Sequence, residues 1–109
     1  MKLLSRPEEL MLLAIWRLRD NAYCVPIRKQ VSDVTGRNWS FGAVYVPLER
    51  LEKRGYISSF LGEPTSERGG RRKRFYKLAK EGLTALIEIE KVEKAMWTDI
   101  PKLTPNGLS

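Results

Sequence analysis

The stretch from Ser40 to Gly55 constrains this chain more than any other, because it has every feature of a short, self-contained helix. A serine before the helix can cap its free backbone amides, and a glycine after it is a common stop. At about 100° per residue, one side is apolar and is predicted to face a core, with Phe41, Val44, Tyr45, Leu48 and Leu51. The opposite side has small residues first and bases later, namely Gly42, Ala43, Val46, Arg50 and Lys53. Such a surface is typical of a helix that enters the major groove of DNA, and a plain amphipathic surface helix is the alternative.

The segments before Ser40 complete a helix-turn-helix pattern. Ser5-Arg6-Pro7-Glu8 predicts a helix start with a capping box, and apolar residues then continue to about residue 20. A second helix is predicted over 26–35, with a proline in its first turn and a glycine after its end. The short turn 37–39 leads directly into Ser40, as in a helix-turn-helix.

A basic hairpin is predicted after Gly55. Residues 56–61 and 72–78 have the aromatic and β-branched content of strands, and a loop rich in glycine and proline separates them. From Arg68 to Lys77 there are six bases and no acid. A charge run is usually a solvated face, but a basic hairpin that follows a helix-turn-helix is the arrangement called a wing. Its glycines would let the tip enter a narrow groove, which favours DNA as the partner.

Two helices are broadly apolar and predict a second subunit. The last helix, over 80–98, carries two adjacent apolar stripes that together cover roughly 200° of arc. The first helix is apolar nearly all round, so it also needs cover on more than one side. We therefore expect a homodimer, with interface residues Leu12, Ile15, Trp16, Ile89, Val92, Met96 and Trp97.

Composition agrees with a polyanion partner and argues against an enzyme. The net charge is +7, made up of +9 over residues 1–80 and −2 over 81–109. The chain has no histidine, one cysteine (Cys24) and no metal-ligand spacing, so no catalytic, cofactor or metal site is expected. No apolar run approaches the ~20 residues of a membrane span, and the single cysteine is typical of a reducing cytoplasm.

The predicted fold class is mainly α with a small β-hairpin wing, that is, a winged helix-turn-helix with a C-terminal dimerisation helix. Residues 1–79 would form the DNA-binding domain, 80–98 the dimerisation helix and 99–109 a flexible tail.

In order and spacing, these motifs resemble the PadR family of bacterial winged-helix transcriptional regulators. The family signature Gly-Thr-Leu-Tyr-Pro-x-Leu-x-Arg-Leu-Glu corresponds here to Gly42-Ala43-Val44-Tyr45-Val46-Pro47-Leu48-Glu49-Arg50-Leu51-Glu52. The family's basic wing and the glycine that opens its last helix correspond to 71–78 and Gly82. The resemblance covers roughly residues 8–97. It implies a DNA-binding regulator that dimerises through its last helix, and some members bind flat hydrophobic ligands between the subunits.

The chain departs from the family pattern in four places, one of which is Tyr23-Cys24-Val25, where the family has Tyr-Gly-Tyr. Ala43 replaces a threonine, which removes a hydroxyl that could bond DNA. Pro47 stands one position late, inside the helix, where it should bend the helix. Ala79 replaces a threonine and leaves the last helix without a side-chain cap, at a cost of about 1 kcal/mol.

Candidate DNA contacts come from the turn, the recognition helix and the wing: Arg28, Lys29, Arg37, Ser40, Gly42, Ala43, Tyr45, Arg71, Arg72 and Arg74. The wing arginines are the strongest candidates, because guanidinium groups suit phosphate oxygens and narrow minor grooves. The resemblance implies a DNA-facing hydroxyl at Tyr45, and a core ring is the alternative. Trp16 and Trp97 are candidates for binding an effector, and two interface tryptophans without a ligand are the alternative.

The sequence therefore predicts a sequence-specific transcriptional regulator of the bacterial cytoplasm and nucleoid. The hypothesis is a repressor that binds a pseudo-palindromic site on double-stranded DNA as a homodimer, with a small hydrophobic or aromatic effector releasing it. The alternative is a winged-helix interaction or assembly module whose basic wing meets an acidic protein.

Overall fold

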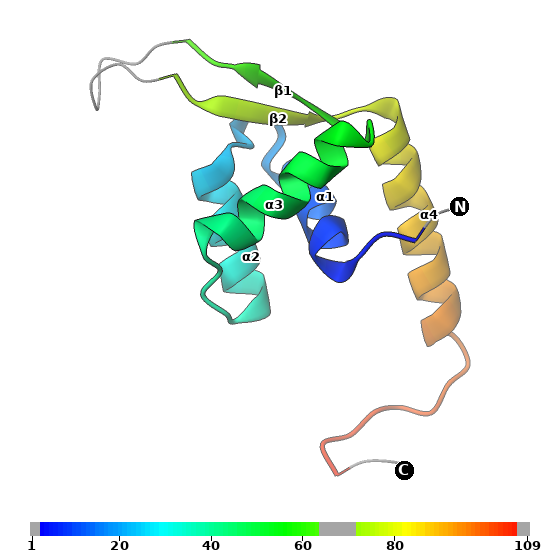
Figure 1. Cartoon of the computed structure of the whole chain (residues 1–109). Coiled ribbons are helices and arrows are strands. Elements are labelled where there is room, and N and C mark those ends of the chain that lie inside the picture. The colour runs from blue at the N-terminus through cyan, green and yellow to red at the C-terminus, as the bar shows by residue number, and fades with distance from the viewer. Residues whose placement is uncertain (1–2, 64–71, 107–109) are drawn as a thin grey trace.

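The computed structural model describes residues 3–63 and 72–106 and has the predicted winged helix-turn-helix architecture (Figure 1). The elements are α1 (Arg6–Leu18), the 3-10 helix η1 (Arg19–Asn21), α2 (Cys24–Thr35), α3 (Phe41–Lys53), β1 (Ile57–Leu61), β2 (Arg74–Leu78) and α4 (Lys80–Trp97). The helix-turn-helix is α2–α3, the wing is the β1–β2 hairpin, and α4 follows the wing directly. The predicted fold class is confirmed.

The helix ends form where the capping residues predict them. In α1, the Ser5 hydroxyl accepts from the amide of Glu8 at 3.3 Å, and the Glu8 carboxylate accepts from the amide of Ser5 at 2.8 Å, which completes the capping box. Gly36 ends α2 with φ 71°, a left-handed conformation that glycine adopts readily. Ser40 begins α3 and accepts from the amide of Ala43 at 3.1 Å.

Helix α3 continues through Pro47, whose ring is buried, and its inner face differs in part from the predicted one. Val44, Leu48 and Leu51 are fully buried, as expected. Phe41 was expected in the core, and Tyr45 either there or facing DNA, but both side chains are about half exposed. Viewed down the helix axis, the buried arc of α3 is centred between Pro47 and Leu48. The rings of Phe41 and Tyr45 therefore lie at the edge of this arc.

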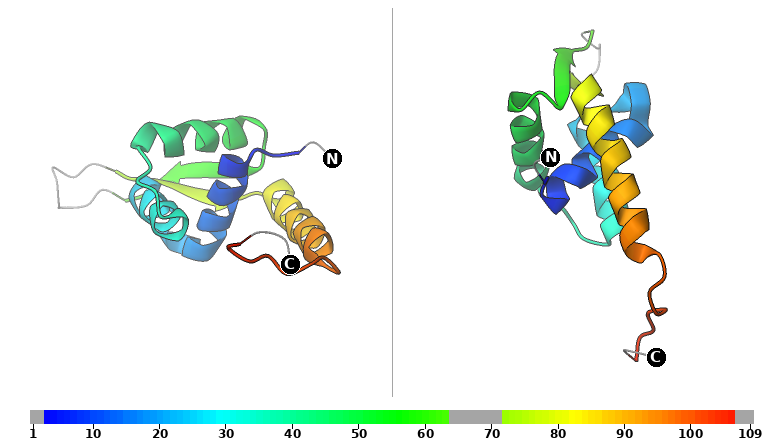
Figure 2. Two further views of the ribbon diagram at one scale, coloured as in Figure 1. Left: turned by 90° about the horizontal axis from the view of Figure 1, so that it is seen from below. Right: turned by 90° about the vertical axis from the view of Figure 1, so that its right-hand side faces the viewer.

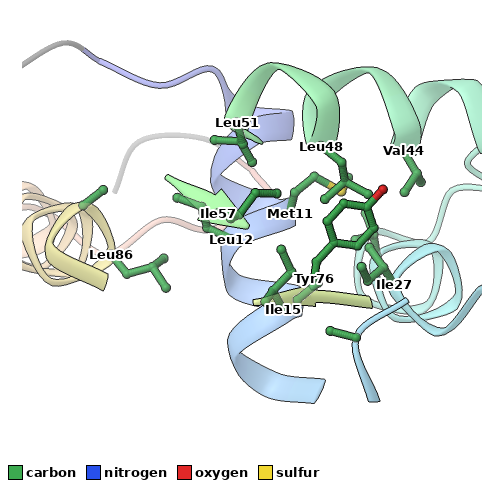
Figure 3. Packing of buried hydrophobic residues seen from close by; sticks show 14 residues of the cluster. Met11, Leu12, Ile15, Ile27, Val44, Leu48, Leu51, Ile57, Tyr76 and Leu86 are labelled. Carbon is green, nitrogen blue, oxygen red and sulfur yellow. The ribbon is translucent and has the colours of Figure 1, made fainter. Parts of the chain in front are cut away.

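Helix α1 lies at the centre of the core and contacts α2, α3, β2 and α4 (Figure 3). Met11 and Leu12 have no exposed surface, and Ile15 is 2% exposed. The prediction that Leu12 and Ile15 lie at a subunit interface is therefore wrong. Helix α1 is indeed apolar on most of its sides, but the chain's own elements cover the side that carries these two residues.

The wing extends from the body on the side away from α4, as two views agree (Figures 1 and 2). Its strands pair in antiparallel register from Ile57 opposite Leu78 to Leu61 opposite Arg74. The predicted wing contact Arg71 lies outside the described residues.

Helix α4 is fixed to the body at its first turn. Ala79 has no side-chain cap, as predicted, and its amide donates instead to the carbonyl oxygen of Tyr56 at 3.0 Å. Gly82 packs so closely on the same carbonyl that a Cβ would lie 2.1 Å from the Tyr56 oxygen. From residue 90 to the end of the helix every residue is exposed, so the second half of α4 extends beyond the core.

A partly buried ion pair joins the start of α1 to the end of α3. Glu8 is 5% exposed, and its Oε2 accepts from Nη1 of Arg54 at 3.2 Å. Burial raises the pKa of the Glu8 carboxyl, but the hydrogen bonds from Ser5 and the charges of Arg54 and Arg50 outweigh it and lower the pKa overall. The second terminal nitrogen of Arg54, Nη2, is buried and has no hydrogen-bond partner among the described residues.

Candidate nucleic-acid interface

The outer face of α3 is open to solvent along its whole length. The exposed line runs through Gly42, Val46, Glu49 and Lys53, opposite the buried residues. Gly42 has no atom within 4 Å of the place where a Cβ would lie, and Val46 is 48% exposed. The flanks of this line carry Ala43 and Arg50 on one side and Tyr45 on the other. No described element covers this face, so its N-terminal half is free to approach another molecule closely (Figure 2).

The turn between α2 and α3 is held by Arg28, which was predicted as a phosphate contact. Its Nε donates to the carbonyl oxygen of Trp39, and Nη2 donates to Oδ1 of Asn38 at 3.2 Å. The guanidinium carbon also lies 4.6 Å from the ring centroid of Phe41. The Trp39 indole donates to the hydroxyl of Thr35 at 3.0 Å. Two of the five guanidinium N–H donors of Arg28 are therefore used in positioning the start of α3.

The other two bases of this region differ in availability. Lys29 is exposed and forms an i,i+4 ion pair with Asp33 at 2.9 Å. Arg37 is exposed at the turn, and its side chain makes no hydrogen bond or ion pair within the described part of the chain. Ser40 uses its hydroxyl as a cap acceptor, and the proton of that hydroxyl is still free to donate.

In the wing, Arg74 and Arg72 have different surroundings. Nη1 of Arg74 donates to the Ser59 hydroxyl at 2.9 Å, and that hydroxyl donates to the Glu52 carboxylate at 2.6 Å. These two hydrogen bonds tie the β1–β2 hairpin to the last turn of α3. Arg72 is exposed, and among the described residues its side chain has no such partner. Arg72 is thus the better placed of the two to bind a phosphate.

Sequence reasoning missed an aromatic cluster that joins the start of α2 to the wing. Tyr23 pairs with Phe75 through an isolated β-bridge, and their rings meet edge to face at 5.3 Å. Phe75 stacks on Phe60 across the hairpin at 5.8 Å. The Lys73 ammonium lies 4.6 Å from the Tyr23 ring centroid and 3.4 Å from its hydroxyl. The sequence predicts that Phe60 and Phe75 lie in strands. It does not predict that Phe75 contacts Tyr23, because about fifty residues separate Tyr23 from Phe75.

Two further observations describe the surface. No group of three or more histidine, cysteine or acidic side chains among the described residues could hold a metal ion. Within the same part of the chain, no helix is long and apolar enough to cross a membrane.

A helix-turn-helix with an uncovered second helix, followed by a basic hairpin, defines a winged helix-turn-helix protein of the kind that binds DNA. The sequence profile described as the transcriptional regulator PadR-like family matches residues 12–88. This chain belongs to that family, whose members are DNA-binding transcription regulators and not enzymes.

Solved structures agree with this assignment. A PadR family transcription regulator from Clostridium difficile R20291 is 27% identical, with a TM-score of 0.66 over 84% of this chain and 90% of that chain. A PadR-like transcription factor from Bacteroides fragilis shares the fold at 23% identity and a TM-score of 0.64, over 83% of this chain and 81% of that chain. A Streptococcus mutans UA159 protein does so at 22% identity and 0.65, over 88% and 86%. A search of curated proteins gives no significant match.

Proposed function

We propose that this regulator is a repressor that binds a pseudo-palindromic operator as a homodimer. The observation that carries the proposal is the separation of two uncovered surfaces. The outer face of α3 and the wing lie on one part of the molecule, and the outer half of α4 lies on another (Figures 1 and 2). Residues 1–79 would then bind DNA while 80–98 pair with a second subunit, in the cytoplasm and on the nucleoid. A symmetric dimer would read two half-sites about one helical turn apart.

The apolar outer face of α4 supports the dimer. Ile87, Val92, Met96 and Trp97 are 63%, 47%, 71% and 56% exposed, and exposed apolar side chains gathered on one element often mark a protein–protein contact. Ile89 packs partly on the core and lies between these residues. On α1, Trp16 is 41% exposed, and the Arg19 guanidinium lies 3.7 Å from its ring centroid. The exposed Leu13 next to Trp16 replaces Leu12 and Ile15 in the proposed interface.

Sedimentation tests the dimer directly. The full chain should sediment as a dimer at micromolar concentration, and Met96→Lys should shift it toward monomer, because a charge would be buried at the centre of the interface. Lys91→Met is the matched control on the same helix and should leave the mass unchanged. A wild-type monomer at these concentrations would rule the proposal out.

Retardation of DNA tests the binding function. The full chain should bind a duplex from its own upstream region, and the affinity should fall steeply between 50 and 200 mM salt, as counterion release requires. Arg72→Ala should weaken binding by about threefold to tenfold on every sequence, because a phosphate contact carries no sequence information. Lys91→Ala, on the far side of the molecule, should have no effect. A loss with Arg72→Ala confined to one base pair would contradict its role. No retardation at low salt would favour an acidic protein as the partner of the wing.

The proposal includes a flat hydrophobic effector that stacks on Trp97. The Trp97 indole is exposed and donates to the Glu93 carboxylate at 3.2 Å, so its ring face is available for stacking. A planar aromatic dye added to the dimer–DNA complex should quench indole fluorescence and release DNA. Both effects should be lost in Trp97→Leu and should persist in the control Lys91→Ala. Release that persists in Trp97→Leu would place the effector elsewhere.

A further inference from the structure

We propose that α3 reads thymine in the major groove through its C5-methyl group, with the side chain of Val46 as the main contact. This inference rests on the proposed entry of α3 into DNA and adds the chemistry of the base that it selects.

The first step is the chemistry of the exposed line on α3. Gly42 and Val46 occupy the outermost positions of the first two turns, and Ala43 stands beside them. These three residues offer no side-chain donor or acceptor. Base edges in the major groove carry hydrogen-bonding groups at every pair, but their one apolar group is the methyl of thymine. A helix face of this composition therefore complements thymine better than any other base.

The second step is the selection of Val46 among the apolar side chains of this half of the helix. Phe41 is held by the guanidinium of Arg28 at 4.6 Å and lies at the edge of the buried arc. Tyr45 carries a hydroxyl that suits a phosphate oxygen. Val46 is 48% exposed and, among the described residues, is not held by an arginine as Phe41 is. It lies one turn after Gly42, where the lack of a side chain gives the DNA room to approach.

The third step concerns the cost of this residue in the free protein. Valine is a poorer helix former than alanine, and an exposed valine adds apolar surface to the outer face of α3. Packing within the chain does not explain its presence, because the core contacts of α3 come from Val44, Leu48 and Leu51. The bases around it fit a polyanion: Arg37 precedes the helix, and Arg50 and Lys53 end it. A contact with DNA gives the exposed methyl groups of Val46 an apolar partner.

The test uses a duplex selected from a random pool by the full chain, in which single thymines of each half-site are replaced by deoxyuridine. This change keeps every hydrogen-bonding group and removes one methyl. At one or two positions per half-site, the wild-type affinity measured by fluorescence anisotropy should fall about fourfold, the value expected for one buried methyl-sized group. In Val46→Ala the same replacement should change affinity less than twofold. Melting temperatures of the two proteins should agree within a few degrees, because the position is exposed.

The outcomes separate this inference from the proposed function. If the parent duplex binds but no deoxyuridine position costs more than twofold, thymine methyls are not read and DNA binding still stands. If the loss at deoxyuridine is the same in Val46→Ala as in the wild type, the methyl is read by another side chain and the assignment to Val46 is overturned. If the full chain selects no duplex at low salt, both the inference and the proposed function fail.

Discussion

Replacement of Gly82 by alanine tests how α4 is joined to the body. A Cβ at this position would lie 2.1 Å from the carbonyl oxygen of Tyr56 and 3.2 Å from its carbonyl carbon. The first contact is shorter than real Cβ atoms make, and the obstacle is backbone. The Tyr56 carbonyl cannot easily turn away, because it also accepts from the amide of Ala79 at 3.0 Å. The start of α4 would have to move by about an ångström to restore normal van der Waals contact.

The magnitude follows from two opposing effects. In an open helix, glycine to alanine stabilises by about 0.5–1 kcal/mol through backbone entropy. Overpacking at Gly82 should cost about 1–3 kcal/mol, and weakening of the Ala79–Tyr56 hydrogen bond should add about 1 kcal/mol. The net effect is a loss of about 1–3 kcal/mol in the free energy of unfolding.

Urea unfolding followed by circular dichroism measures this loss, at one fixed protein concentration because the proposed dimer makes stability concentration-dependent. Gly42→Ala is the matched control, because a Cβ at Gly42 would have no atom within 4 Å. This substitution should stabilise the protein or leave its stability unchanged. If Gly82→Ala proves as stable as Gly42→Ala, the close contact between α4 and the Tyr56 carbonyl is refuted.

Three further predictions concern other parts of the molecule. The lowered pKa of Glu8 means that its carboxylate stabilises the fold above about pH 4.5 and that this contribution is lost as the pH falls through the folded-state pKa. Glu8→Gln keeps an oxygen that can accept from Arg54 but removes the negative charge of the ion pair, so it should lower the free energy of unfolding by about 1–3 kcal/mol at pH 7. The difference in stability between the two proteins should narrow in acid, and a difference independent of pH would contradict this. Glu49→Gln should tighten DNA binding in anisotropy assays by about threefold to tenfold, because an exposed carboxylate on the outer line of α3 repels phosphates; weaker binding would show that Glu49 instead accepts from a base. Tyr23→Ala should weaken DNA binding more than Tyr23→Phe, because only the first removes the ring that packs on Phe75 and supports the wing, and equal effects in gel shift would argue against that support.

Much of the fold could be predicted because its signals are local. The capping box at Ser5, the glycine after α2 and the cap at Ser40 each act within a few residues, so the helix starts and stops follow from the order of residue types. The hairpin follows from two β-prone runs around a turn-rich loop, and the basic character of the wing is visible as an uninterrupted charge run. Apolar periodicity also predicted correctly that Val44, Leu48 and Leu51 face the core.

The candidate interface was less predictable, because its side chains are shared with partners that lie far along the chain. In the sequence, Arg28 and Arg74 look as available to DNA as Arg37 and Arg72 do. In the structure, Arg28 donates to the carbonyl oxygen of Trp39, eleven residues away, and Arg74 donates to the hydroxyl of Ser59, fifteen residues away. These bonds leave Arg37 and Arg72 as the more available cations. The aromatic pairing of Tyr23 with the wing has no local signal at all.

The sequence by itself determined the elements, their order and the basic wing, because caps, turn residues and charge act over short distances. Only the tertiary structure decided which apolar side of α1 is buried against other elements of the same chain. Apolar burial has no direction of its own, so a helix that is apolar nearly all round can be covered from any side. Here the neighbouring elements enclose Leu12 and Ile15 and leave Trp16 exposed, which determines the surface that remains available to the proposed second subunit.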